Sequence, residues 1–355
     1  MDNNISTSHS QRVDYIDALK GFLILSVVMC HVAGFCIGIQ DDTPSFLPIL
    51  FEFRNPPFFF ISGYFAYKIG SNWNAHILIE AIKKKSIAIA WPTFVFLLAL
   101  LHVHPSHNGH SFLHDDITDL WFHWFTLSLF VFFCFYYIAV YCLRFIKYEI
   151  VKSVIFLTIG IASYLLFSVQ SVYLRLPIAS STKDVLGMTY WGFFLFFILG
   201  VLTKKHAHLW HSLLENKYCI AVCILLFFLF NLYSQPLQEK HFNLFRLTTY
   251  LTGIVLVISF FKNYTPQGLL KRISVFTGRR TLDIYLIHYF FLPLGLYDCL
   301  SLFRETPMPI IEFFVTLSIS LVIIALSLLT SYIIRLSPLT ALLILGDNRI
   351  QNKKT

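Results

Sequence analysis

Two ionisable residues, Lys20 and His31, lie in the first long apolar run of the chain, which reads DALKGFLILSVVMCHV from Asp17 onward. Residues eleven positions apart on an α-helix share a face and are separated by ~16 Å along its axis. Asp17 lies on roughly the same face. A histidine held away from water titrates in the range that suits a general base, which activates a hydroxyl by taking its proton. The spacing therefore predicts a candidate base and a candidate cation on one helix face.

A second group of histidines could suggest a metal site, because zinc favours clusters of histidine and carboxylate ligands. The stretch HVHPSHNGHSFLHDD is rich in Pro, Gly, Asn and Ser, however, and lacks a rigid ligand spacing such as HExxH on a helix. We predict a solvated loop and no metal cofactor, both here and at the later group His206, His208 and His211. The residues of the first stretch are His102, His104, His107, His110, His114, Asp115 and Asp116.

The composition places all these residues in a membrane protein. Hydrophobic residues make up 57% of the 355 residues and charged residues only 13%, whereas soluble domains carry about a quarter charged residues. The seven cysteines show no disulfide framework or metal spacing. The net charge of +8 does not require a nucleic-acid partner, because lysine and arginine mark cytoplasmic loops.

Ten segments are apolar enough to span a bilayer, which takes roughly 17–25 helical residues. They predict an all-α, polytopic membrane helix bundle with about ten transmembrane helices, and nine or eleven are alternatives. Residues 1–17 form an N-terminal segment, 18–335 one membrane domain and 336–355 a C-terminal tail. The segments are Ala18–Ile39, Ile49–Ile69, Ser86–Val103, Leu120–Phe145, Val151–Val169, Val185–Thr203, Tyr218–Tyr233, Phe245–Phe261, Leu282–Cys299 and Ile310–Arg335.

The distribution of basic residues predicts the orientation of these segments. If the N-terminus is cytoplasmic, all but six of the 27 lysines and arginines fall on the cytoplasmic side. Both termini are therefore expected in the cytoplasm. The six external residues are Arg54, Arg175, Lys183, Lys240, Arg246 and Arg304.

Structural roles would also explain Lys20 and His31. Lys20 could extend its ammonium group to the membrane surface, and His31 could donate a hydrogen bond to a neighbouring carbonyl group. Ionisable groups within a membrane span are costly, however, and are functional candidates by default.

Five motifs, in order along the chain, resemble the membrane acyltransferase-3 family, the multipass O-acyltransferases that include sugar and polysaccharide O-acetylases. The resemblance spans nearly the whole chain and implies about ten helices. The motifs are DALKG with the run ending at His31, the stretch FEFRNPPFFFISGYF, Lys83–Lys85 followed by Trp91-Pro92, WFTLSLF (Trp124–Phe130), and Gly278 with TLDIYLIH (Thr281–His288).

The resemblance implies transfer of an acetyl group from cytoplasmic acetyl-CoA to a hydroxyl of a glycan or its lipid-linked precursor. The family motif of a basic residue, ten residues and a histidine maps onto Lys20 and His31. It implies that His31 is the base and that Lys20 holds a phosphate of coenzyme A, with Asp17 orienting Lys20 or balancing its charge. Lysine replaces the more usual arginine and offers a point charge instead of a guanidinium group that can bind a phosphate through two hydrogen bonds. Direct transfer and an acetyl-histidine relay are both open.

Further donor-side candidates are His288, Arg279 and Arg280. His288 could line the donor path or form a hydrogen bond to a neighbouring helix. The two arginines, at the cytoplasmic start of the same segment, could bind phosphate or only mark the orientation.

On the external side, Glu52 and Arg54 could bind an acceptor sugar or form a structural ion pair. Many relatives have histidine in place of Arg54. Trp124 could stack on a sugar or belong to the interfacial aromatic belt.

Two other classes would fit the composition. A transporter or flippase would be expected to carry paired intramembrane carboxylates or inverted repeats, and neither is clear in this sequence. A non-catalytic sensor or scaffold would leave the ordered motifs unexplained. We therefore expect a multi-pass O-acetyltransferase of a bacterial cytoplasmic membrane. Its expected partners are acetyl-CoA, a glycan or lipid-linked sugar and membrane lipids, and the oligomeric state is left open.

Overall fold

The computed structural model describes residues 5–39, 47, 54–68, 73–103, 123–169, 188–234, 242–264, 266–296 and 308–347. Every regular element in these ranges is a helix, and they contain no β-strand. The all-α prediction is therefore confirmed. The chain forms two compact units. The first comprises Met1–Phe58 and His208–Ser331, and the second comprises Phe59–Ala207 and Tyr332–Thr355.

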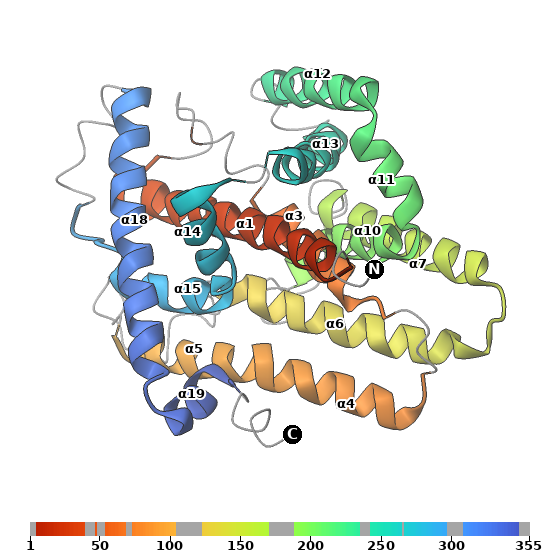
Figure 1. Ribbon diagram of the computed structural model, residues 1–355, viewed down its shortest axis with the longest axis horizontal. Helices are drawn as coiled ribbons and strands as arrows, with labels where there is room; N and C mark the ends of the chain where they lie inside the picture. The colour runs from red at the N-terminus through yellow and green to blue at the C-terminus, as the bar shows by residue number, and fades with distance from the viewer. Residues whose placement is uncertain are drawn as a thin grey trace. The chain divides into compact units, whose positions relative to one another are not determined.

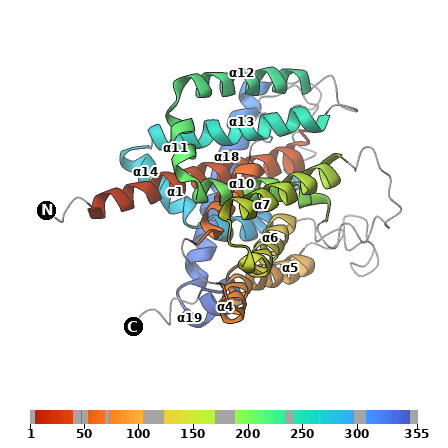
Figure 2. The ribbon, with the colours of Figure 1, turned by 90° about the vertical axis from the view of Figure 1, so that its right-hand side faces the viewer.

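The first unit combines one long N-terminal helix with helices from the C-terminal half of the chain. They are α1 (Ile5–His31), η1 (Val32–Ile37), α11 (Ala207–Glu215), α12 (Lys217–Ser234), α13 (Phe242–Asn263), α14 (Gly268–Gly278), α15 (Thr281–Ile287), η7 (His288–Phe291) and α18 (Pro309–Ile334). α1 packs against α13, α14 and α15 (Figure 1), and α12 runs alongside α13 (Figure 2). The first predicted span is thus the second part of a longer helix that ends at His31, where the π-helix η1 begins.

The second unit contains most of the middle of the chain and the C-terminal helix. Its elements are α3 (Asn55–Ala66), α4 (Ala75–Lys85), η2 (Ser86–Ala90), α5 (Trp91–Val103), α6 (Trp124–Cys142), η4 (Leu143–Phe145), α7 (Glu149–Tyr164), η5 (Leu165–Val169), η6 (Met188–Phe193), α10 (Phe194–Lys205) and α19 (Pro338–Leu345). α7 packs on α10, α4 on α6, and α5 on α19. Trp91 of α5 donates a hydrogen bond from Nε1 to the Leu343 carbonyl of α19 at 2.6 Å.

Five described helical stretches are long and apolar enough to cross a membrane: Asp14–Ile37, Trp124–Phe145, Glu149–Phe167, Phe245–Asn263 and Pro309–Ile334. A sixth arises if α11 and α12, bent by 77° at a short break, are counted together. These stretches coincide with the first, fourth, fifth, eighth and tenth predicted segments, and the bent pair contains the seventh.

The other four predicted segments contain shorter helices. α3 begins at Asn55, so Pro56 and Pro57 lie in its first turn, where their missing N–H groups cost no helical hydrogen bond. η2 precedes α5, η6 precedes α10, and η7 follows α15. Residues 48–53, 170–187 and 297–307, which belong to or border three of these segments, lie outside the described part of the chain.

Glycines allow helices to approach each other closely within each unit. In the second unit, a Cβ atom on Gly63 would overlap the backbone carbonyl of Phe197, and one on Gly200 would overlap that of Phe60. Gly63 of α3 and Gly200 of α10 thus lie where these two helices approach closely. In the first unit, the same relation joins Gly278 of α14 to the Asp17 carbonyl of α1. Small residues of this kind let helix backbones meet in a membrane.

Candidate active site

His31 and His288 meet in the first unit, although 257 residues separate them in the chain. His31 is the last residue of α1, and His288 begins η7 directly after α15. His31 Nδ1 lies 2.7 Å from His288 Nε2. The His31 ring is half-buried, whereas the His288 side chain is fully buried. The packing of α15 on α1 thus joins two candidates from opposite ends of the sequence.

The two imidazole rings are almost parallel, with an interplanar angle of 8° and centroids 5.0 Å apart. This centroid distance is close to the nitrogen–nitrogen distance plus two ring radii. The contact therefore lies along the line between the ring centres, where an in-plane N–H and an in-plane lone pair point. The geometry is that of a hydrogen bond and not of face-to-face stacking.

Each histidine has a further partner. His288 Nδ1 lies 3.0 Å from the carbonyl oxygen of Ile284, one turn earlier in α15. The hydroxyl of Tyr289 lies 3.3 Å from His31 Nε2, and Tyr285 forms a side-chain hydrogen bond with Tyr289. The result is a continuous chain of polar groups through a buried part of the first unit.

Arg54 contributes positive charge to this centre. It is close enough to act electrostatically on both His31 and Tyr289. A cation beside a histidine could stabilise negative charge that develops on a reacting oxygen. Glu52, its predicted neighbour at the external mouth, lies outside the described residues.

A network of ion pairs lies at the other end of the polar stripe of α1, the helix face that carries Asp17, Lys20 and His31. Lys20 Nζ lies 2.6 Å from Asp17 Oδ1, and Arg279 Nε lies 3.0 Å from Asp17 Oδ2. Asp14 pairs with Lys271 at 3.1 Å and with Arg279 at 3.4 Å. Two carboxylates thus meet three cations, and this group retains one excess positive charge. The Arg279 side chain is 58% exposed, so part of that charge faces the surroundings.

Arg280 makes a different set of contacts. Its Nη1 lies 3.4 Å from the Ser331 hydroxyl, and the same hydroxyl donates to Asp283 Oδ2 at 2.6 Å. Asp283 and Ser331 are both buried. Arg280 therefore links α15 to α18, whereas Arg279 belongs to the network around Asp17.

Trp124, the remaining predicted site residue, lies in the second unit. Its indole stacks on the Tyr190 ring at a centroid distance of 3.9 Å and an angle of 21°. It also contacts Phe59, Phe125 and Phe193. The side chain is therefore part of an aromatic cluster.

The histidine-rich stretches show no metal geometry in the ranges that the structure describes. No group of three or more His, Cys, Asp or Glu side chains there could hold a metal ion. Residues 104–122, which include most of the first histidine cluster, lie outside those ranges. His206 lies 3.3 Å from the Ser153 hydroxyl, and His211 lies 3.4 Å from Lys262.

Several residues of the site were missed by the sequence analysis. Tyr289 directly follows the motif that ends at His288, and an aromatic hydroxyl beside a candidate histidine was a usable signal. Asp14 lies three positions before Asp17 on the same helix face, which was a second signal. Lys271 gave none, because only the packing of α14 on α1 shows what it meets.

The second unit holds a lysine in an unusual environment. The Lys85 ammonium group lies 3.6 Å from the centroid of the Phe133 ring. Burial, together with the charges of Lys84 and Lys68, lowers the pKa of Lys85 from 10.5 to about 8. The sequence showed three consecutive lysines and could not show which of them is buried.

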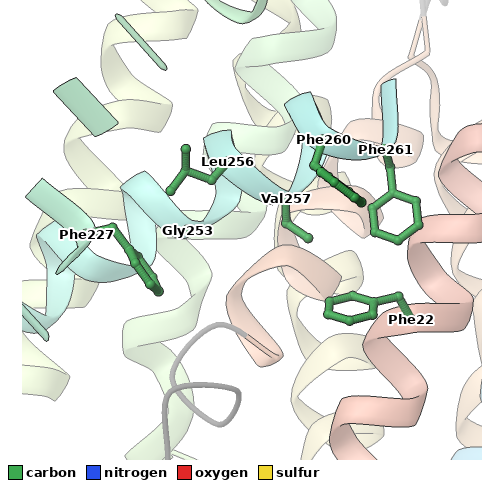
Figure 3. A pocket seen from close by; sticks show the side chains of 7 residues that line it. All are labelled: Phe22, Phe227, Gly253, Leu256, Val257, Phe260 and Phe261. Carbon is green, nitrogen blue, oxygen red and sulfur yellow. The ribbon is translucent and has the colours of Figure 1, made fainter. Parts of the chain in front are cut away.

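An apolar pocket of about 270 Å³ lies between α1, α12 and α13 (Figure 3). None of its lining residues carries a polar side chain, so it offers no group for acid–base chemistry. The pocket is also separate from the histidine pair, because Phe22 lies nine residues before His31 on α1 and thus ~13 Å away along the axis. Its lining residues are Phe22, Phe227, Gly253, Leu256, Val257, Phe260 and Phe261.

Long apolar helices that carry a histidine pair and a network of ion pairs indicate an integral membrane protein with a polar site in its helical bundle. A family model described as an acyltransferase domain, that of the acyltransferase-3 family, matches residues 13–335. The chain belongs to this family, and the resemblance found in its motifs is confirmed. It is thus a membrane acyltransferase. No curated protein and no solved structure shows a significant match to the chain.

Proposed function

We propose that the protein is an O-acetyltransferase that transfers an acetyl group from acetyl-CoA to a hydroxyl of a cell-surface glycan or its lipid-linked precursor. The observation that carries this proposal is the pairing of His31 with His288 at the end of a candidate membrane span. A half-buried histidine whose partner is fully buried is suited to proton transfer. Family membership supports acyl transfer as the reaction class.

In the proposed reaction, His31 takes the proton from the acceptor hydroxyl as its oxygen attacks the thioester carbonyl carbon. The tetrahedral intermediate collapses with loss of the coenzyme A thiolate. The proton held by His31 then passes to that thiolate, so the histidine returns to its starting state. Arg54 is the proposed cation that stabilises the oxyanion, because its charge reaches the surroundings of His31.

An acetyl-histidine relay would use the same residue as a nucleophile and would release coenzyme A before the acceptor binds. The two routes differ in a measurable way. Single-turnover mixing with labelled acetyl-CoA and no acceptor releases coenzyme A and labels the protein at His31 only in the relay.

The proposed donor site is the ion-pair network at the N-terminal end of the stripe, on the cytoplasmic side. Lys20 and Arg279 of this network, together with the nearby Arg280, would hold the phosphates of coenzyme A, with the net positive charge of the network as the attraction. Asp17 would orient Lys20 or balance its charge. An extended pantetheine arm would cover the ~16 Å from Lys20 to His31, and His288 would flank its reactive end.

A matched pair of substitutions tests the donor site. Lys20→Ala should raise the KM for acetyl-CoA, and Lys20→Arg should restore it because the charge is kept. An unchanged KM in the alanine variant would exclude Lys20 from donor binding.

We also propose about ten transmembrane helices, with both termini in the cytoplasm of a bacterium and the chain in its cytoplasmic membrane. The excess of lysine and arginine on one side supports this orientation. Activity of a reporter enzyme that works only outside the cytoplasm, fused after Thr355, would contradict this orientation. In the proposed orientation, the acceptor approaches from the external side, near Glu52 and Arg54.

The decisive experiment incubates membranes that contain the full chain with radiolabelled acetyl-CoA and glycan extracted from the host cell surface. Label in the glycan indicates an O-acetyltransferase, whereas a transporter or flippase leaves the glycan unlabelled. His31→Ala should abolish labelling while the protein stays in the membrane. His206→Ala, which removes a histidine bonded to Ser153 in the second unit, is the matched control and should retain labelling.

A further inference from the structure

We infer that α14 lies along the membrane surface, with its outer face in the lipid and Arg272 bound to the headgroup of an anionic phospholipid. In the orientation proposed above, this is the cytoplasmic surface. The inference goes beyond acyl transfer and does not depend on its chemistry. It concerns the short helix that packs on α1 beside Asp17, and its partner is the bilayer itself.

α14 is too short to cross a membrane, and it lies where two candidate spans end. Its 11 residues extend for ~16 Å along the helix axis, about half of the hydrocarbon core. The helix begins five residues after Asn263, the last residue of the candidate span of α13. It packs on the N-terminal part of the α1 span (Figure 1), where Gly278 approaches the Asp17 carbonyl. Both neighbours therefore hold α14 at the level at which their spans enter the membrane.

The outer face of α14 is apolar and exposed. The exposed fractions are 72% for Leu269, 68% for Leu270, 53% for Ile273 and 51% for Phe276. With 3.6 residues per turn, these four positions fall within about one third of the helix circumference, on the side away from Gly278. A group of large, exposed apolar side chains marks a surface that contacts lipid or a partner.

Two arginines lie along one edge of this apolar face. Arg272 is exposed, and Arg279, almost two turns later on the same edge, keeps 58% of its side chain exposed despite its contact with Asp17. A helix with leucine and phenylalanine on one face and arginine beside it binds at a membrane interface, where arginine attracts anionic headgroups. Tyr264, shortly before α14, is 69% exposed and is a typical residue of the interfacial belt.

The other conceivable occupants of the face are a second copy of the chain and a different protein. Either would require a separate association step. The bilayer, in contrast, already surrounds α1 and α13 when these helices are inserted, so lipid reaches the outer face of α14 without a further partner. The arginine edge also complements the negative charge of phospholipid headgroups. We therefore assign this surface to lipid.

A matched pair of cysteine substitutions tests where the face lies. The full chain, one copy per nanodisc of phosphatidylcholine and phosphatidylglycerol in equal amounts, is treated with a charged, water-soluble maleimide. Peptide mass spectrometry reads each site separately from the native cysteines. The thiol of Ile273→Cys should react at least ~10-fold more slowly than that of Arg272→Cys, because lipid covers the apolar face and not its edge.

Two results of this labelling would overturn the inference. Equal rates at the two sites would show that the apolar face meets water. Protection of Ile273→Cys in native membranes that disappears in single-copy nanodiscs would show that a protein, and not lipid, covers the face.

The role of the Arg272 charge is tested by lipid binding to the full chain purified in detergent. Native mass spectrometry gives the apparent Kd for phosphatidylglycerol, with phosphatidylcholine as the control lipid that carries no net charge. Arg272→Gln should raise the Kd for phosphatidylglycerol by ~5-fold, the contribution of one arginine near an anionic surface, and should leave that for phosphatidylcholine unchanged. Arg272→Lys keeps the charge and should stay within about two-fold of the wild type.

Size-exclusion profiles and thermal unfolding check that each variant is folded. An unchanged Kd for phosphatidylglycerol in Arg272→Gln would overturn the assignment of the headgroup to this residue. An equal loss in Arg272→Lys would do the same, because the charge would then not be the cause.

Discussion

Replacing Gly278 by alanine should loosen the contact that holds α14 against α1. A Cβ atom at this position would overlap the carbonyl oxygen of Asp17, and it would lie 2.6 Å from the Asp17 carbonyl carbon and 3.0 Å from the Gly21 nitrogen. All three are backbone atoms and cannot move aside by a side-chain rotation. The two helices must therefore separate, or one must shift along the other.

The expected cost follows from this geometry. Overpacking of one methyl group typically costs about 1–3 kcal/mol, and backbone obstruction favours the upper part of that range. Arg279 follows Gly278 directly, so a shift of α14 also lengthens its 3.0 Å contact with Asp17. For a large domain, we expect the apparent Tm to fall by about 2–6 °C.

The assay is thermal unfolding of the purified chain in detergent, with Gly34→Ala as the control. Gly34 lies in η1, only three residues after His31, and an added Cβ would meet nothing within 4 Å. The control should unfold within about 1 °C of the wild type, which lies below the shift expected for one kcal/mol. A Gly278→Ala chain as stable as this control would refute the packing argument.

Three further substitutions probe other parts of the structure. Lys85→Met should raise the apparent Tm at pH 7, because the lowered pKa of about 8 means that the fold disfavours the charged amine. At 1.36 kcal/mol per pKa unit, the penalty is at most ~3 kcal/mol. The gain in Tm should shrink as the pH rises from 8 to 10.5, where the wild-type amine is neutral in the fold. Glu312→Ala should cost about 1 kcal/mol by removing the oxygen that accepts from a backbone N–H at the start of α18, whereas Glu312→Gln, measured in the same unfolding assay, should retain stability. Trp124→Phe should lower the Tm because its stacking on Tyr190 is weakened, without changing the KM for the acceptor.

Each of these predictions has an outcome that contradicts it. A gain for Lys85→Met that stays constant from pH 7 to 10.5 would show that charge burial is not its cause. Equal losses for the two Glu312 variants would mean that the capping oxygen is unimportant. An increase in acceptor KM for Trp124→Phe at unchanged Tm would place that indole in substrate binding.

The sequence predicted helices well where apolar runs are long and uninterrupted. The runs that became α13 and α18 are of this kind, and both helices were expected close to their observed ends. The run after Leu282 was less predictable, because α15 gives way to a 3-10 turn at His288. Hydropathy does not register such a change, since it depends on the side chains and not on the backbone geometry, which tightens here.

Some members of the candidate site could be predicted from the sequence, but their contacts could not. Lys20 and His31 could be related by helical geometry, because both lie on one continuous helix. No periodicity links His31 with His288, or Asp17 with Arg279, because these pairs arise from packing between distant segments. The residues missed entirely, such as Lys271, matter only through such contacts.

One continuous segment, residues 268–291, holds α1 at both ends of its polar stripe. At one end, Arg279 and the close approach of Gly278 fix the helix through Asp17. At the other end, ten residues after Gly278, His288 fixes it through His31. The spacing between Asp17 and His31 on α1 is therefore matched by the spacing between Arg279 and His288 on the segment that packs against it. Each motif alone supplies only half of these contacts, so the distance between the ion-pair network and the histidine pair depends on both helices keeping their register.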